Sequence, residues 1–339
     1  MLHSVLDLAF VTTSTPPSQA LRNTIALAGE AEALGYHRYW TAEHHNLPSV
    51  ACSAPEVLIA RIAAETSTLR VGSGGVMLPN HAPLMVAERF RTLEALYPGR
   101  IDLGIGRAPG TDHVTSYALR HRQAQGGGDD FLERLRELLM FETGDFPERH
   151  PFRTIGAMPI DTPLPPVFLL GSSDYGGELA ARMGLGFAFA HHFASYDAAT
   201  VMRAYRDGFV QTGWRDRPHA ILAVSAIAAD TQDEAERLAA SADLNGVRRA
   251  RGIYLPLPDP DEAAAHVYAP EDRAVRDSNR KRLFVGTPDR IAERLAPLLA
   301  ATRADEIMMT TPVFDHAARV RSYRLLADRV GAMDAPATV

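Results

Sequence analysis

Cysteine is almost absent from this chain, and basic residues are not in excess. Cys52 is the only cysteine among 339 residues, so the chain can form neither an internal disulfide nor a zinc site built from several thiolates. The 35 lysine and arginine residues are outnumbered by 41 aspartate and glutamate residues, which gives a formal net charge of −6. Because basic side chains neutralise phosphate backbones, this balance argues against a nucleic-acid partner. A lone thiol also fits a reducing compartment, so we expect a cytoplasmic protein.

Long hydrophobic runs are missing as well. Nowhere do about 18 apolar residues follow one another without interruption, which argues against a membrane-spanning helix and a membrane partner. The apolar segment from Leu2 to Val11 has no basic leader, contains Asp7 and lacks a small-residue cleavage site. It therefore predicts a first β-strand rather than a signal peptide. With 46% hydrophobic and 22% charged residues, the composition predicts a compact soluble protein with a large core.

Strand-like and helix-like segments alternate along the chain. Eight short apolar runs alternate with amphipathic stretches of helical periodicity, which is the repeat number of a (β/α)8 barrel. The sequence therefore predicts an α/β fold with a single TIM barrel. The expected strands are Ser4–Val11, Arg38–Ala42, Leu69–Met77, Ile101–Ile105, Val167–Leu170, Gly186–Ala190, Ala220–Ala229 and Glu306–Thr310. The expected helices are Gln19–Leu34, Pro55–Thr66, Pro83–Leu96, Phe131–Phe141, Gly177–Met183, Ala198–Gln211, Asp233–Ala242, Pro288–Leu299 and His316–Val330.

Three segments are longer than the minimal repeat requires, and we expect them to be insertions in one domain that spans residues 1–339. They cover about residues 113–130, 144–166 and 252–286. The third combines prolines with many charges, which argues against a buried strand there. Long insertions often form lids or substrate walls, although plain surface excursions explain these segments equally well.

Polar residues follow the second expected strand directly, in the segment Glu43-His44-His45. The carboxyl ends of parallel barrel strands meet at one face, where active sites lie. Adjacent residues of an extended segment point to opposite sides, so only one of the two histidines can face the barrel mouth. A histidine there suits proton transfer or contact with a bound ring, while a structural role stays open. We expect no metal ligands, because the segment lacks the i,i+4 spacing and the recurring carboxylates of a metal site.

Glycines follow the third and fourth expected strands. Gly72-Ser73-Gly74-Gly75 lacks the Lys-Ser/Thr pair of a P-loop, and Gly104-Ile105-Gly106 with Gly110 misses the dinucleotide fingerprint by one residue. Glycine at the end of a barrel strand instead permits unusual backbone geometry or the close approach of a flat ring. We expect a cis or otherwise strained peptide at Gly74-Gly75.

Arg107 follows the fourth expected strand, and Gly171-Ser172-Ser173 follows the fifth, just before a helix. A guanidinium, two hydroxyls and the N–H groups of a helix start together predict an anion site suited to a terminal phosphate. TIM barrels frequently bind phosphate at their strand ends. The alternative is that Ser172 or Ser173 only caps the helix and that Arg107 pairs with Asp112.

These segments resemble the bacterial luciferase-like flavin monooxygenases. The similarity lies in Trp40-x-x-Glu43-His44-His45, in Val71-Gly72-x-Gly74-Gly75-x-x-Leu78-Pro79 and in the run from Pro98 to Gly110. It continues through Gly171-Ser172-Ser173 and ends in Val285-Gly286-Thr287-Pro288, so it covers almost the whole chain. The single pieces are common, but their combination is specific.

The resemblance implies a TIM barrel, usually dimeric, that holds FMN at its C-terminal mouth. His44 would take the role of the family's catalytic histidine, and Arg107 and Ser173 would bind the FMN phosphate. Gly74-Gly75 would be the family's non-prolyl cis peptide beneath the flavin ring. The further cofactor-binding residues expected on this basis are Glu43, Gly106, Gly171 and Ser172. Gly106 stands where the light-emitting luciferase subunit has a cysteine, so light emission is not implied.

The resemblance also implies the reaction of a two-component FMN-dependent monooxygenase. A separate flavin reductase would supply reduced FMN, since the chain shows no complete nicotinamide fingerprint. O2 would then form a flavin C4a-(hydro)peroxide that oxygenates an organic small molecule, for which a secondary metabolite is one candidate. Two alternatives stay open: a deazaflavin-dependent oxidoreductase that transfers hydride, and a flavin-binding protein without turnover.

Overall fold

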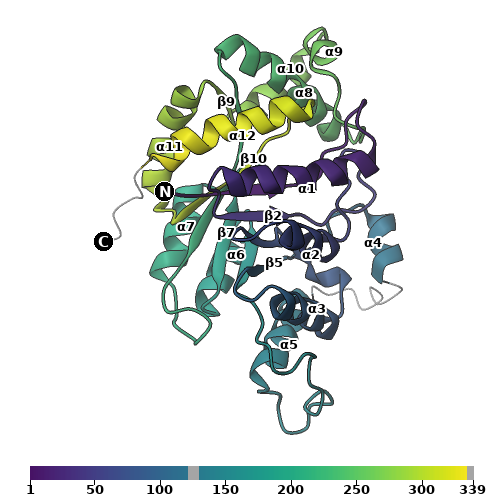
Figure 1. Cartoon of the computed structure of the whole chain (residues 1–339), viewed down its shortest axis with the longest axis vertical. Coiled ribbons are helices and arrows are strands. Elements are labelled where there is room, and N and C mark those ends of the chain that lie inside the picture. The colour runs from purple at the N-terminus through teal and green to yellow at the C-terminus, as the bar shows by residue number, and fades with distance from the viewer. Residues whose placement is uncertain (121–129, 334–339) are drawn as a thin grey trace.

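The computed structural model describes residues 1–120 and 130–333. Strands form the centre of the molecule and helices surround them (Figure 1). The expected TIM barrel is confirmed, because eight parallel strands close into a ring. Residues 121–129, which belong to the first expected insertion, lie outside the described residues.

The barrel strands pair in chain order, and β10 closes the ring by pairing with both β1 and β8. In ring order the strands are β1 (Leu2–Asp7), β2 (Arg38–Thr41), β3 (Arg70–Ser73), β5 (Ile101–Gly106), β6 (Val167–Gly171), β7 (Gly186–Ala190), β8 (Ala220–Ala228) and β10 (Glu306–Thr310). All of these pairs are parallel, so every carboxyl-terminal strand end lies on the same face of the barrel.

The helices pack apolar stripes against the outside of this ring. In α1, for example, Leu27, Ala28 and Ala31 are buried at the three- and four-residue spacing of one helix face. The helices are α1 (Pro17–Ala33), α2 (Pro55–Glu65), α3 (Pro83–Leu96), α4 (His113–Arg120), α5 (Phe131–Thr143), α6 (Asp174–Arg182), α7 (Ala198–Asp207), α8 (Gln232–Ala250), α9 (Pro260–Ala264), α10 (Pro270–Arg280), α11 (Pro288–Thr302) and α12 (His316–Gly331), with a short 3-10 helix at Leu78–Asn80.

The third insertion contains a buried strand that the sequence analysis argued against. β9 (Leu283–Gly286) pairs with the second half of β8, from Ser225 to Ala228, outside the closed ring. The prediction was wrong because the prolines and charges of this insertion all lie ahead of the strand, in the segment before α9, in α9 and α10, and in the turns beside them. β8 is nine residues long, so its first half is available to β10 and its second half to β9.

Two of the expected strands end earlier than their apolar runs do. The run Leu69–Met77 is divided into β3 and β4 (Val76–Met77), with Gly74-Gly75 between the two strands. The first strand ends at Asp7, and Ala9 takes a positive φ of 53° that turns the chain. Both changes place loop residues at the barrel mouth where the sequence predicted continued strand.

The second insertion, residues 144–166, follows α5 and projects at the lower end of the molecule in Figure 1. Arg91 of α3 anchors it, because the guanidinium donates to the carbonyl of Ala157 at 2.6 Å and pairs with Glu142 at 2.6 Å. Glu142 in turn accepts a hydrogen bond from the backbone of Leu164 at 2.9 Å. The insertion is therefore tied to the outer helices at both of its ends.

Side chains inside the barrel form an apolar layer that combines two aromatic rings with aliphatic side chains. This layer contains Leu6, Trp40, Phe168, Ile221 and Met308. The Trp40 indole fits because Gly72 on the next strand has no side chain: a Cβ there would lie 2.7 Å from Trp40 Nε1. Trp40 Nε1 instead donates to Asp102 at 3.2 Å.

Below the apolar layer, at the amino ends of the strands, lies a buried network of ion pairs. Arg38 of β2 contacts Asp102 of β5 at 2.7 Å and Glu306 of β10 at 2.8 Å. Asp102 also pairs with Arg70 at 2.6 Å, and Glu306 contacts His219 at 3.0 Å. Burial alone would raise the pKa of both carboxyls, but Arg38 and the neighbouring donors outweigh it and lower both pKa values. The network joins strands that lie on different sides of the barrel.

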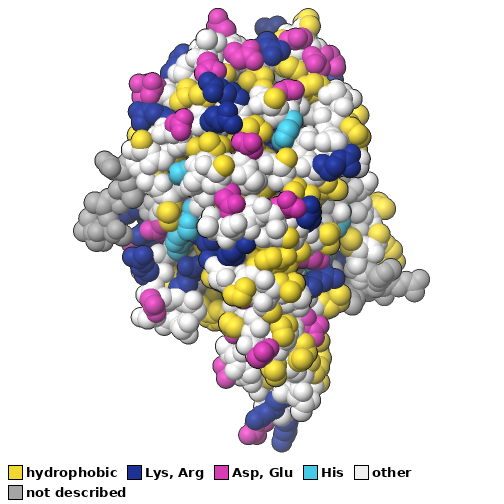
Figure 2. Space-filling view, in the orientation of Figure 1, with side chains coloured by type: hydrophobic (Ala, Val, Ile, Leu, Met, Phe, Trp, Pro, Cys, Tyr) yellow, Lys and Arg dark blue, Asp and Glu magenta, His cyan; other side chains and the backbone are white. Residues whose placement is uncertain are grey.

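Charges of both signs are distributed over the outer surface. On the face in Figure 2, acidic and basic side chains are interspersed rather than separated into patches of one sign. None of the helices within residues 1–120 and 130–333 is both long enough and apolar enough to cross a bilayer.

We predict that Glu306→Gln lowers the free energy of unfolding by about 3–5 kcal/mol, because it leaves Arg38 incompletely paired in the barrel interior. Urea unfolding at pH 7 measures this loss. The folded-state pKa of Glu306 lies below its unfolded value near 4.3, so its contribution is present above about pH 4 and disappears as the pH falls. The difference between wild type and variant should therefore shrink in acid.

Arg321→Gln is the matched control, since it breaks an exposed pair with Asp230 and should lower the free energy of unfolding far less than Glu306→Gln does. Equal losses for the two variants would show that the buried network contributes no more than a surface ion pair.

Candidate active site

The predicted site residues lie together at the carboxyl-terminal ends of neighbouring strands. His44 follows β2, Gly74-Gly75 follow β3, Gly106 ends β5, and Arg107 comes directly after it. On the adjacent strand β6, Leu170 is in register with Gly106, so Gly171, Ser172 and Ser173 are at the same level of the mouth as Arg107. The structure thus brings together residues that are up to 129 positions apart in the sequence (from position 44 to position 173).

The peptide bond between Gly74 and Gly75 is cis, as the sequence analysis predicted. The N–H of Gly74 donates to the carbonyl of Thr41 at 2.9 Å, which ties this bend to β2. Neither glycine has room for a side chain, because a Cβ would lie 2.6 Å from Leu6 Cδ1 at Gly74 and 2.7 Å from the carbonyl oxygen of Gly104 at Gly75. The close packing restricts both positions to glycine.

Glu43 has a fully buried carboxylate that connects two of the mouth loops. It accepts a hydrogen bond from the backbone N–H of Met77 at 2.8 Å and contacts Nε2 of His45 at 2.8 Å and of His81 at 2.9 Å. Burial would raise the pKa of this carboxyl, but the bonds from His81, Met77 and His45 lower it. The contacts give Glu43 a structural role in the loops, and its expected contact with a cofactor stays a prediction.

His44 is held apart from this cluster, which confirms that the two adjacent histidines point to different surroundings. Its backbone N–H donates to the carbonyl of Cys52 at 2.9 Å, and its Nδ1 is buried without a hydrogen-bond partner among the described residues. Burial, reinforced by the positive charge of Arg249, lowers the pKa of His44 to about 4. The imidazole is therefore neutral near pH 7 and able to accept a proton.

His192 is a second, partly buried imidazole that follows a barrel strand, and the sequence analysis did not select it. It follows β7, and its Nδ1 lies 3.2 Å from the carbonyl of Ala223 on β8. Burial lowers its pKa to about 4, and the charges of His191, Arg249 and Arg282 act in the same direction. The signal was present in the sequence, since His191-His192 follow a strand just as His44-His45 do.

Arg107 lies beside the start of α6, and the expected anion site there stays a prediction. The Arg107 guanidinium lies 4.4 Å from the ring centroid of Tyr175, a residue in the first turn of α6. Ser173 is the N-cap residue, yet no amide of the described first turn donates to its hydroxyl, so the capping alternative is wrong for Ser173. Asp112, the suggested partner of Arg107, accepts hydrogen bonds from Asn46 at 3.0 Å and from the Thr115 hydroxyl at 2.7 Å.

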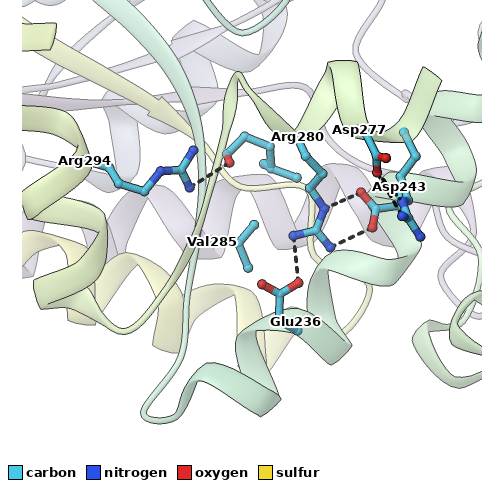
Figure 3. A pocket seen from close by; sticks show the side chains of 8 residues that line it. Glu236, Asp243, Asp277, Arg280, Val285 and Arg294 are labelled. Carbon is cyan, nitrogen blue, oxygen red and sulfur yellow. Dashed lines mark hydrogen bonds and ion pairs between the residues drawn. The ribbon is translucent and has the colours of Figure 1, made fainter. Parts of the chain in front are cut away.

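A hollow of about 450 Å³ opens elsewhere, between α8, α10, α11 and β9 (Figure 3). Its charged lining is paired internally: Arg280 contacts Asp243 at 2.6 Å and Glu236 at 2.9 Å, and Arg276 contacts Asp277 at 2.9 Å. These pairs hold α10 against α8. We therefore interpret the hollow as part of the packing between the third insertion and α8, and not as a ligand site.

Within the described residues, no three histidine, cysteine, aspartate or glutamate side chains are grouped so that they could hold a metal ion. The chemistry available at the mouth consists of neutral imidazoles, guanidinium groups and helix N–H donors. The arrangement suits an anionic cofactor and a proton acceptor on one barrel face.

Fold and site together define a TIM-barrel protein with a neutral histidine, an arginine and a helix N-terminus at its carboxyl-terminal strand ends. A model of the luciferase-like monooxygenase family matches residues 1–332. The chain is 42% identical to a luciferase-like monooxygenase of Escherichia coli (strain K12), over 96% of both chains. It is 35% identical to N-acetyl-S-alkylcysteine monooxygenase of Bacillus subtilis (strain 168), over 96% of this chain and 97% of that one. The crystal structure of apo-MsnO8 shares 40% identity and a TM-score of 0.89, over 98% of each chain.

The chain belongs to the luciferase-like monooxygenase family, as the sequence motifs predicted. It is accordingly a flavin-dependent monooxygenase. More distant structures share the fold alone. One is the oxygenating constituent of 3,6-diketocamphane monooxygenase from Pseudomonas putida in complex with FMN, at 19% identity, a TM-score of 0.71 and 99% coverage of each chain. Another is an F420-dependent secondary alcohol dehydrogenase, at 14% identity, a TM-score of 0.63 and coverage of 97% and 98%.

We predict that His44 stays neutral from pH 8 down to about pH 5.5 and titrates near pH 4, because burial and Arg249 disfavour its charged form. The Cε1 chemical shift of labelled histidine measures the titration, and His44→Gln assigns the resonance. The unfolded imidazole titrates near pH 6.5, so this site loses stability as the pH falls from about 6.5 toward 4. A midpoint near 6.5 in the folded protein would refute burial of the ring.

Proposed function

We propose that this chain is the oxygenase component of a two-component FMN-dependent monooxygenase that oxygenates an organic small molecule. The observation that carries the proposal is the arrangement of a phosphate-type donor set and a neutral imidazole on one barrel face of a chain from this family. A separate flavin reductase supplies reduced FMN, because no complete nicotinamide fingerprint is present in the sequence.

The residues at the mouth fit FMN. Arg107, the hydroxyls of Ser172 and Ser173 and the N-terminal amides of α6 suit the terminal phosphate. The Gly74-Gly75 bend presents backbone without side chains, which allows a flat ring to lie close to it. Bound reduced FMN supplies the electrons that activate O2.

His44 is the proposed proton acceptor and donor for this chemistry. Its neutral form at pH 7 and its buried Nδ1 without a protein partner leave it able to exchange a proton with a bound molecule. The loops and helices that follow the barrel strands also carry large apolar side chains that an organic molecule could contact: Tyr175, Phe193, Tyr196 and Tyr254 are each more than a third exposed.

The domain organisation, the oligomeric state and the location of the protein belong to the same proposal. We propose that residues 1–339 act as one domain, that two copies form a homodimer as is usual for the family, and that the protein works in the cytoplasm. Hydride transfer by a deazaflavin is the competing function. Flavin binding without turnover is the other alternative.

The experiment that separates these functions is an anaerobic titration with reduced FMN, and in parallel with reduced deazaflavin, followed by exposure to air. Tight binding of reduced FMN and a change in its rate of reaction with O2 support the monooxygenase. Binding of the deazaflavin alone contradicts it, and FMN binding with an unchanged rate of oxygen reaction supports the non-catalytic alternative.

We predict that Arg107→Ala weakens FMN by a factor of about 10 to 100 and changes riboflavin affinity little, since its proposed partner is the phosphate. Fluorescence titration of both flavins measures the two affinities. Arg182→Ala is the control, because it removes an exposed arginine of α6 that pairs with Glu178. It should leave the affinities for FMN and for riboflavin unchanged. Equal losses for FMN and riboflavin would indicate a structural arginine.

We predict that His44→Ala binds FMN within about twofold of wild type but releases more hydrogen peroxide per reduced flavin oxidised, because proton control beside the flavin is lost. Peroxide release and the rate of flavin reoxidation are measured in stopped flow. His266→Ala, on the exposed loop between α9 and α10, is the control. Wild-type peroxide release in the His44 variant would remove this histidine from the mechanism.

A further inference from the structure

Two guanidinium groups on the His192 side of the mouth are not neutralised by carboxylates. Arg249 lies in the last turn of α8, and Arg282 lies directly before β9. Among the acidic side chains of residues 1–120 and 130–333, none approaches either guanidinium within ion-pair distance. The arginines beside Arg249 differ, because Arg248 pairs with Glu262 at 3.4 Å and Arg251 pairs with Asp272 at 2.7 Å.

The fold places Arg249 at the mouth. α8 follows β8, and Gly252, with a φ of 74°, turns the chain at the helix end. The segment beyond it reaches the loop that follows β1, where Leu257 N–H donates to the carbonyl of Val11 at 2.9 Å. The charge of Arg249 acts on both His44 and His192, which follow β2 and β7. Arg249 is therefore within electrostatic reach of imidazoles from two separate strands.

Arg282 is fixed in place by backbone and amide contacts. Its Nη1 donates to the carbonyl of Ala194 in the loop after β7 at 2.6 Å, and its Nη2 to Asn279 at 3.3 Å. Its Nε is buried and has no hydrogen-bond partner among the described residues. An unsatisfied buried donor on a partly buried cation is costly, and a bound anion would satisfy it.

The acidic groups nearest these imidazoles are engaged elsewhere. Glu43 bonds His45, His81 and the Met77 amide, and Asp197 caps α7 by accepting from Thr200 at 2.7 Å. Neither carboxylate pairs with Arg249 or Arg282 among the described residues.

Apolar side chains border the same part of the mouth. Ile253, Tyr254 and Leu255 follow Arg249 along the chain and are 45%, 50% and 44% exposed. Across from them, the loop after β7 carries Phe193 and Tyr196, which are 62% and 49% exposed. A ligand bound here would meet cations and apolar surface together.

We propose that the oxygenated substrate is an organic carboxylate with an apolar body, and that Arg249, supported by Arg282, binds its carboxylate beside His44. The proposal rests on the proposed monooxygenase function and names its substrate class. The site is separate from the FMN phosphate donors, since Arg107 and Ser173 follow β5 and β6 whereas Arg249 and Arg282 belong to α8 and the start of β9.

Isothermal titration of the full chain with octanoate and with octanamide tests the site, because the two probes share an apolar tail and differ in charge. We expect the wild type to bind octanoate at least about tenfold more tightly than octanamide. Arg249→Gln should remove this preference by weakening octanoate alone. Arg248→Gln, whose arginine is one residue away and already paired with Glu262, should behave as the wild type. The His44 titration midpoint should rise in the Arg249 variant and stay in the Arg248 variant.

Lack of an octanoate preference in the wild type, or the same loss in both arginine variants, would overturn the proposal. So would an Arg249→Gln variant that loses FMN affinity but keeps riboflavin affinity, because Arg249 would then bind the flavin phosphate. The titrations are made without flavin, so they do not depend on oxygen chemistry. An octanoate preference in a protein that fails to bind reduced FMN would contradict the proposed function and leave the carboxylate site intact.

Discussion

The buried ion pairs around Arg38 hold the barrel strands in register. Arg38 contacts carboxylates from β5 and β10, and Asp102 also reaches Arg70 on β3. A shift of one residue in any of these strands would turn its charged side chain to the other face and leave buried charges without partners. The same shift would move the opposite end of the strand by about 3.3 Å. The positions of the mouth residues therefore depend on contacts at the far end of the barrel.

The architecture could be predicted because its signals are local. Each barrel strand is a short apolar run and each outer helix an amphipathic one, so periodicity alone located all eight repeats. β9 could not be found in this way, because Leu283–Gly286 ends an insertion rich in prolines and charges and pairs with a part of β8 that the ring leaves open. The division of the third strand was visible as paired glycines, although the packing that requires them comes from Leu6 and Gly104 on other strands.

Candidate site residues that directly follow a barrel strand could be predicted, whereas those that lie in other elements were missed. His44, Arg107 and the serines before α6 all follow strand ends, and strand ends can be read from the chain. Arg249 is the eighteenth residue of α8 (from 232 to 249), so it does not follow a strand end and was not selected. Its position near two imidazoles depends on the length of α8 and on the path of the chain after Gly252. The residues beside the arginine in the sequence predict neither of these.

Closure of the ring by β10 has a consequence for how the chain is made. β1 pairs with β10 along Leu2 to Val5, and β10 also supplies the partner for the first half of β8. During synthesis both β1 and β8 keep an open edge until residues near 310 have left the ribosome, and unpaired strand edges invite pairing with other chains. Nascent or truncated chains that lack β10 are thus the aggregation-prone forms of this protein, and translation speed through the last repeat governs how long they persist.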